Sequence, residues 1–137
     1  GADTARSFDA PDYADFMADM LADLVVLKDN AMAAGVRAEN IILDPGLGFG
    51  KTVEQNCRII SDLAAFKALG CRLLLGPSRK SFIGRALGDL PPDQRLEGTA
   101  AAVALGVANG ASVVRVHDVQ AMRRVADMTH IIQRSAL

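Results

Sequence analysis

The sequence predicts an α/β fold with parallel strands, because three short apolar runs typical of buried strands are each followed by a polar motif and then by a helical pattern. The apolar runs occupy residues 41–43, 73–75 and 113–114. The polar motifs occupy residues 44–52, 76–81 and 115–118. In parallel α/β folds the segments that follow the strands meet at one edge of the sheet, so we expect the three motifs to form a single site.

Length and composition narrow the class of protein. The 137 residues suit one domain with a core of its own, and the 50% hydrophobic and 23% charged composition is typical of a globular protein. A formal net charge of −1 offers no basic surface for nucleic acid, and no apolar run approaches the roughly 20 residues that cross a bilayer. The start is unlike a signal peptide, and Cys57 and Cys71 lack metal-ligand spacing, so we expect reduced, buried thiols in a cytoplasmic protein.

The number of βα units leaves two architectures open. About three units are visible between residues 1 and 137, whereas a complete (β/α)8 barrel takes roughly 250 residues. The chain is therefore either a small open-sheet domain or the C-terminal portion of a larger barrel. The sequence has no internal repeat and no obvious interdomain linker, so residues 1–137 are treated as one unit.

The first predicted helix starts near Asp9 and Pro11, which suit a helix cap and first turn, and ends near Gly35. A short continuous apolar run at residues 41–43 then predicts a buried parallel strand. The apolar face of this first helix is expected to consist of residues spaced three or four apart: Phe16, Met20, Leu24, Leu27 and Ala31.

A second helix is predicted by a capping-box pattern at Thr52 and Gln55 and is expected to continue to Gly70. A strand at residues 72–75 and a short helix at residues 81–87 follow. The expected inner face of the second helix consists of four large apolar residues: Ile59, Ile60, Leu63 and Phe66.

After a proline-containing loop, residues 96–109 form an Ala- and Gly-rich predicted helix. Gly98 and Gly106 lower its helix propensity, so we expect close packing to offset that loss. A strand at residues 112–116 and a last helix at residues 119–133 complete the chain. The expected buried residues of the last helix are Met122, Val125, Met128 and Ile132.

The glycine-rich motif at residues 44–52 is not a nucleotide P-loop, because the position five residues before Gly50 is Pro45 where that motif needs glycine. Asp44 ends the strand instead. One interpretation is a loop carboxylate that caps nearby amides. The other is a recognition group, because an ionised carboxylate accepts two parallel hydrogen bonds from an amino-imino edge.

The other two motifs favour an anion site. Ser78, Arg79 and Lys80 place cations and a hydroxyl after a strand, although a solvated basic turn is the alternative interpretation. Arg115 and His117 are two residues apart on a strand, so we expect both side chains on one side, where they suit a phosphate or diphosphate. Asp118 is predicted to cap the following helix or to orient His117. No Cys/His metal spacing is visible, and a Mg²⁺ ion held by phosphates would leave little trace.

Together the three motifs resemble those of the dihydropteroate synthase family. The stretches are Asp44-Pro45-Gly46-x-Gly48-Phe49-Gly50-Lys51-Thr52, Ser78-Arg79-Lys80-Ser81-Phe82-Ile83-Gly84 and Arg115-Val116-His117-Asp118-Val119. The resemblance extends from about Asp9 to the end and is specific because all three motifs occur in order. It implies a (β/α)8 barrel of which this chain supplies the last three strands.

The resemblance also implies a function. That family makes dihydropteroate in folate biosynthesis from a dihydropterin methyl diphosphate and para-aminobenzoate, releases diphosphate with the help of Mg²⁺, and is the target of sulfonamides. It implies that Asp44 binds the pterin edge, that Lys80 hydrogen-bonds the pterin ring, and that Arg115 and His117 bind the leaving diphosphate. By the same resemblance, four residues contact the aminobenzoate or allow close approach to the ring: Phe49, Gly76, Ser78 and Arg79.

The family's N-terminal features have no match here, including an Asn on the first strand and polar pterin contacts on the fourth and fifth strands. We therefore expect about half of the site, a chain that is inactive alone, and either a homodimer or association with a missing N-terminal half. A non-catalytic pterin-binding or partner subunit, a methyltetrahydrofolate-type pterin-binding domain and a generic phosphate-binding domain are the alternatives. The Ser78-Arg79-Lys80 turn favours the synthase, and the carboxylate of Asp44 would repel a plain phosphate.

Overall fold

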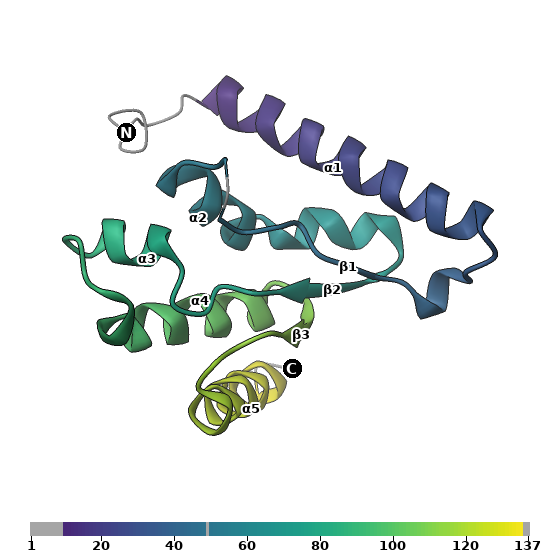
Figure 1. The fold of residues 1–137 in the computed structure, drawn as a ribbon. Coiled ribbons are helices and arrows are strands. Elements are labelled where there is room, and N and C mark those ends of the chain that lie inside the picture. Colours follow the sequence, from purple (N-terminus) through teal and green to yellow (C-terminus); the bar gives the residue numbers. More distant parts are fainter. Residues whose placement is uncertain (1–9, 49, 136–137) are drawn as a thin grey trace.

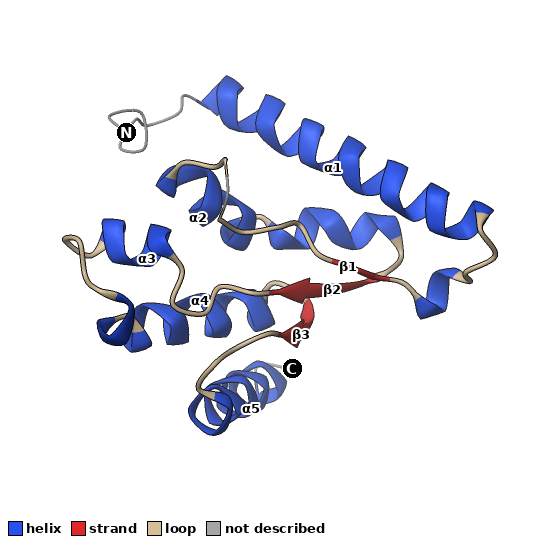
Figure 2. Ribbon diagram, in the orientation of Figure 1, coloured by secondary structure: helices blue, strands red, loops and turns tan. Residues whose placement is uncertain are grey.

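The three predicted strands form one parallel sheet. The computed structural model describes residues 10–48 and 50–135. Strands β1 (Ile42–Leu43), β2 (Arg72–Leu75) and β3 (Ala111–Val114) lie in the order β1-β2-β3, with β2 in the centre (Figure 2). The predicted βα units and their parallel pairing are confirmed.

Helices connect and cover the strands. In Figure 1, α1 lies across α2 at the top, α4 lies beside β2, and α5 lies at the opposite end from α1. None of the described helices is long and apolar enough to cross a membrane. The α-helices are α1 (Ala10–Ala33), α2 (Val53–Ser61), α3 (Ser81–Ala86), α4 (Leu96–Ala108) and α5 (Val119–Ser135), and the 3₁₀ segments are η2 (Ala38–Asn40), η3 (Leu63–Leu69) and η4 (Pro92–Gln94).

The core lies between one face of the sheet and the helices. Leu43, Leu73 and Leu75 alternate with more exposed residues along β1 and β2, as expected for strands covered on that face. The other face is open: Ile42 and Val113 are 47% and 36% exposed. Residues of the helices that complete the core include Met17, Leu24, Ile59, Ile60, Leu63, Phe66, Phe82, Ile83 and Ala102.

The second predicted helix is two helices. The capping box is present, because the Thr52 hydroxyl accepts the Gln55 N–H at 3.1 Å and the Gln55 side chain accepts the Thr52 N–H at 3.0 Å. However, α2 ends at Ser61 and the chain continues as η3. In a 3₁₀ segment residues i and i+3 lie above one another, and this places both Leu63 and Phe66 in the core with no exposed surface.

Some predictions of burial are wrong. Leu27, Met128 and Ile132 are 57%, 55% and 58% exposed although their spacing predicted an inner face. Helix α1 is buried through Met17 and Leu24, and α5 packs against α4 but is fully buried only at Met122. The spacing of apolar residues identifies one face of a helix, but burial also requires an element that packs against it.

The cysteines also differ from expectation. Cys57 and Cys71 are both free thiols, but Cys57 is exposed and Cys71 is half-buried rather than buried. Cys57 lies on α2 on the side facing away from the fully buried Ile59, which explains its exposure. Partial burial of the sulfur, together with the nearby Glu54 carboxylate, still raises the pKa of the Cys57 thiol.

Candidate functional site

The three loops that follow the strands form a shared cavity of about 360 Å³. Each loop begins where its strand ends, so the parallel topology brings together segments that are distant in the sequence. Leu74 and Val116 complete the lining. The predicted site residues in this cavity are Asp44, Gly76, Ser78, Lys80, Arg115 and His117.

Ser78 fixes the orientation of His117. The Ser78 hydroxyl oxygen is 3.0 Å from the His117 backbone nitrogen, whose N–H it accepts, and 2.6 Å from Nδ1 of the same residue. Because the oxygen already accepts the backbone N–H, its own proton is available for Nδ1. In the tautomer in which Nδ1 accepts that proton, Nε2 carries the ring proton and is a donor for an anion. Ser78 is only 8% exposed, so this arrangement is sheltered from water.

Arg115 continues the pairing between β3 and β2 by one residue beyond the end of β3. The strand was predicted to reach residue 116 and ends at Val114, but the Arg115 N–H still donates to the Leu75 carbonyl at 3.0 Å. That bond continues the ladder by one residue and aligns Arg115 with Gly76. A β-carbon at Gly76 would lie 3.8 Å from Cβ of Arg115, so the two backbones lie close at the cavity wall.

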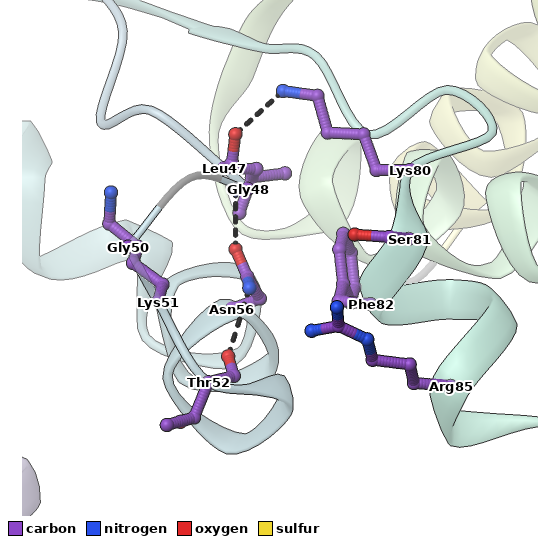
Figure 3. A pocket seen from close by; sticks show the side chains of 10 residues that line it. All are labelled: Leu47, Gly48, Gly50, Lys51, Thr52, Asn56, Lys80, Ser81, Phe82 and Arg85. Atoms are coloured by element: carbon purple, nitrogen blue, oxygen red, sulfur yellow. Dashed lines mark hydrogen bonds between the residues drawn. The ribbon is translucent and has the colours of Figure 1, made fainter. Parts of the chain in front are cut away.

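Lys80 connects the loops after β1 and β2. Its Nζ donates to the Leu47 carbonyl at 2.7 Å, as Figure 3 shows. Burial lowers the pKa of the Lys80 ammonium below its ordinary value of 10.5, Lys51 and Arg115 lower it further, and Asp44 opposes them. Lys80 is therefore a partly desolvated cation with one carboxylate and two further cations nearby, and a perturbed group of this kind in a cavity is a candidate for ligand binding.

Asp44 is the acidic member of the cavity. Its Oδ1 accepts the Gly46 N–H at 2.8 Å, and Gly46 adopts a positive φ of 74° that permits this tight turn. The turn fixes the carboxylate at the cavity edge, where it is exposed to an incoming ligand. The carboxylate therefore caps one amide, and because it also faces the cavity the recognition role stays a prediction.

A second, larger cavity of about 590 Å³ lies between the loop after β1 and helix α3. In Figure 3 one wall carries Lys80, Ser81, Phe82 and Arg85, and the other carries the loop and α2. Lys80 lines both cavities, so ligands in the two would be neighbours. The loop and α2 contribute Leu47, Gly48, Gly50, Lys51, Thr52 and Asn56.

Several residues of this second cavity were not predicted. Lys51 and Ser81 belong to motifs already noted, and Arg85 lies one turn after Ser81 on α3, so helical spacing was the available signal for it. Asn56 had no such signal. It is 1% exposed, its Oδ1 accepts the Gly48 N–H at 2.7 Å, and its Nδ2 donates to the Thr52 carbonyl at 2.9 Å.

Arg79 makes its contacts outside both cavities. Arg79 does not line either cavity, and its Nη2 donates to both carboxylate oxygens of Asp118, at 3.1 and 3.3 Å. The Asp118 side chain thus binds Arg79, and the Asp118 backbone carbonyl accepts the Met122 N–H at the start of α5. His117 is contacted by Ser78 rather than by Asp118. Phe49 lies outside the described residues.

The comparisons with known proteins agree with this geometry. The family model described as "Pterin binding enzyme" matches residues 2–117. The chain belongs to the pterin-binding enzyme family. It is 51% identical over 116 residues to dihydropteroate synthase of Bacillus subtilis (strain 168), an alignment that covers 85% of this chain and 40% of that protein.

Solved structures extend the match to the fold. A dihydropteroate synthase from Coxiella burnetii in complex with pteroic acid is 36% identical, with a TM-score of 0.83, and the match covers 90% of this chain and 47% of that one. Dihydropteroate synthase from Thermus thermophilus in complex with 4-aminobenzoate is 35% identical, with a TM-score of 0.80, covering 95% and 51%.

The chain therefore spans about half the length of the pterin-binding enzymes it matches. The predicted resemblance to dihydropteroate synthase is confirmed, and so is the barrel interpretation of the fold. The open-sheet alternative is excluded by the match of all three βα units to part of a dihydropteroate synthase barrel.

Proposed function

We propose that this chain carries the C-terminal half of a dihydropteroate synthase active site. The enzyme would condense a dihydropterin methyl diphosphate with para-aminobenzoate and release diphosphate. The observation that carries the proposal is the convergence of Asp44, Lys80, Arg115 and His117 on one cavity at the carboxyl ends of three parallel strands. Family membership and the pteroic acid complex of the related enzyme support it.

The first cavity suits the pterin diphosphate. Asp44 would accept two hydrogen bonds from the amino-pyrimidine edge, and Lys80 would donate to the ring. Arg115 and the Nε2–H of His117 would bind the diphosphate, whose negative charge grows as the bond between carbon and oxygen breaks. Fixed donors that face this growing charge stabilise the transition state more than the ground state.

The second cavity suits para-aminobenzoate. Its opening next to Lys80 would bring the aromatic amine close to the methylene carbon, and Lys51, Ser81 and Arg85 supply charge and hydrogen bonds for the carboxylate. The related Thermus enzyme in complex with 4-aminobenzoate supports the assignment of this ligand class. The neutral amine requires positioning rather than a strong base, because it attacks with its own lone pair. The predicted contacts of Phe49, Ser78 and Arg79 with the aminobenzoate stay predictions. Ser78 lines the first cavity and Arg79 lines neither, so these two would contact the aminobenzoate only where it extends past Lys80.

Magnesium fits this site only together with its substrate. Within residues 10–48 and 50–135 no three His, Cys, Asp or Glu side chains cluster as a metal site, and the proposed diphosphate side of the first cavity is lined by Arg115 and His117, neither of which supplies an oxygen ligand. We propose that Mg²⁺ is held by diphosphate oxygens and water, where it adds positive charge against the leaving group.

The free thiols of both cysteines support a cytoplasmic location for this activity.

The decisive experiment replaces the matching C-terminal part of the Bacillus subtilis enzyme with residues 1–137 and measures dihydropteroate formation. We expect an active chimaera. Asp44→Ala in the chimaera should weaken pterin binding about 100-fold, because a charged acceptor of two hydrogen bonds is lost, but should leave inorganic diphosphate binding unchanged. Calorimetric titration measures both affinities.

The matched control is Asp127→Ala, which removes an exposed carboxylate on α5 that pairs only with Arg123 in the described structure. This variant should retain both affinities and the activity. A folded but inactive chimaera would contradict the proposed function. Unchanged pterin affinity in Asp44→Ala would contradict the pterin assignment of the first cavity.

A further inference from the structure

Three consecutive residues after β2 point to three different partners. Ser78 contacts His117, Arg79 pairs with Asp118, and Lys80 reaches the Leu47 carbonyl. The geometry of this turn therefore decides whether the proposed pterin and diphosphate contacts form at all.

The backbone at Arg79 is left-handed, with a φ of 57°. This conformation costs roughly 1–2 kcal/mol for a residue with a β-carbon, so it persists only where the surroundings hold it. Both of its backbone hydrogen-bonding groups are held by side chains. The Arg79 N–H donates to Oγ1 of Thr99 at 3.1 Å, and the Arg79 carbonyl accepts from Nη1 of Arg95 at 2.8 Å.

The two supporting side chains are themselves fixed. Thr99 is fully buried on α4, and its N–H donates to the Arg95 carbonyl at 2.9 Å. Nε of Arg95 donates to the Leu90 carbonyl at 2.8 Å, which orients the guanidinium. A β-carbon at Gly84 would lie 2.5 Å from Nε of Arg95, so the absence of a side chain at Gly84 is what admits the guanidinium.

The Thr99 hydroxyl has no role in capping its own helix. The N-cap position of α4 is Arg95, and that cap makes no side-chain hydrogen bond. A buried hydroxyl inside an apolar helix needs a partner, and the partner here is a backbone amide of the site. The hydroxyl therefore serves the turn rather than the helix.

We propose that Thr99 and Arg95 are positioning residues that hold the turn at Arg79 in its left-handed form, so that Ser78 and Lys80 face their partners. This inference rests on the proposed function. Neither residue lines either cavity, so an effect on catalysis would have to pass through the turn.

The test uses Thr99→Val in the chimaera, because valine has the shape of threonine and lacks only the hydroxyl. We expect kcat/KM to fall about 10- to 100-fold, as expected when catalytic groups are displaced by a fraction of an ångström to one ångström. Thr99→Ser retains the oxygen and should recover activity to within about 3-fold of the unmodified chimaera. Hydrogen exchange at the Arg79 amide should accelerate in the valine variant only.

Thr129→Val is the matched control, because Thr129 is a half-buried threonine of α5 whose hydroxyl donates to the Val125 carbonyl. It should leave kcat/KM and Arg79 exchange unchanged. If Thr99→Val does not fold, Arg95→Lys provides the second variant. Lysine retains the charge but replaces the rigid guanidinium, whose Nε and Nη1 reach the Leu90 and Arg79 carbonyls, with a single nitrogen on a flexible stem, and we expect a similar fall. A folded Thr99→Val or Arg95→Lys with unchanged kcat/KM would overturn the inference.

An inactive chimaera would contradict the proposed function but would still permit a test of the turn. In the 137-residue chain, ¹⁵N resonances of the His117 ring report the contact between Ser78 and Nδ1. We expect Thr99→Val to shift these resonances and Thr129→Val to leave them in place. Unchanged resonances in Thr99→Val would overturn the inference regardless of activity.

Discussion

At the scale of single residues, charge and burial act together on Lys80. The ammonium is partly removed from water and has Lys51 and Arg115 nearby, and all three influences lower its pKa, while Asp44 opposes them. Its hydrogen bond to the Leu47 carbonyl keeps the charged group in place despite these influences. A ligand with acceptor atoms would replace lost hydration around Lys80, which gives part of the binding energy a clear physical origin.

The lowered pKa of Lys80 predicts a dependence of stability on pH. In the unfolded chain the group keeps its ordinary value of 10.5, so the native state releases its proton first as the pH rises. The unfolded state then binds more protons in the window below 10.5, and the free energy of unfolding contributed by Lys80 rises with pH across that window. Urea denaturation of the wild type and of Lys80→Met measures this contribution as the difference between their free energies of unfolding. We expect the free energy of the wild type to rise relative to that of Lys80→Met between neutral pH and a pH just below 10.5.

Asp44→Asn provides the companion variant. It removes the influence that raises the pKa of Lys80, so it should widen the pH window over which the stability difference grows. A stability difference between wild type and Lys80→Met that does not change with pH would show that Lys80 keeps its ordinary pKa in the folded chain.

At the scale of elements, close contacts between helices and strands position the loops. Gly106 lies where α4 crosses β2, and a β-carbon there would be 2.5 Å from Cδ2 of Leu75. Leu75 is fully buried and immediately precedes Gly76 of the first cavity. On the other side of the site, Asn56 of α2 holds the loop that presents the Leu47 carbonyl to Lys80. Two helices therefore support the two walls of the site.

Gly106→Ala should destabilise the chain although alanine is the better helix former. The propensity gain is about 1 kcal/mol, while forcing an extra methyl into a filled core costs about 1–3 kcal/mol. Chemical denaturation should therefore show a net loss of about 1 kcal/mol. Leu75→Val shortens the opposing side chain and should reduce the cost of Gly106→Ala when the two are combined. An increase in stability for Gly106→Ala alone would contradict close packing at this crossing.

At the scale of the whole molecule, the sheet is covered on one face and open on the other. Ile42 and Val113 are substantially exposed on the open face, and β1 and β3 are edge strands within the described part of the chain. In the related enzymes, which are about twice as long, the matching region is only part of the chain. Exposed apolar sheet faces and unpaired edges promote association.

We therefore predict that the 137-residue chain either self-associates or pairs with the N-terminal half of a barrel. Light scattering should give a mass above that of a 14.4 kDa monomer, or should show a complex when the N-terminal half of the Bacillus subtilis enzyme is added. Ile42→Thr should weaken the association, because it makes the open face more polar. A stably folded monomer that binds no N-terminal half would contradict this prediction.

Local sequence patterns predict the order of the βα units and the residues that follow each strand. Apolar runs and caps are local patterns, so the strands were placed to within two residues at each end. Parallel pairing then forces strand ends together, which is why Asp44, Gly76, Lys80, Arg115 and His117 line one cavity. Arg79 follows the same strand as Lys80 and yet lies outside that cavity.

The partners that hold these residues depend on tertiary packing. Thr99 contacts the amide of Arg79, which is 20 positions away in the sequence. Asn56 holds the loop after β1 through the Gly48 N–H and the Thr52 carbonyl. No periodic pattern in the sequence predicts either contact. The pairing of Arg79 with Asp118 and the exposure of Leu27 likewise depend on how whole elements pack. A local pattern shows where a strand ends and which residues follow it, whereas the supports of a turn are set by side chains that only folding brings within hydrogen-bond distance.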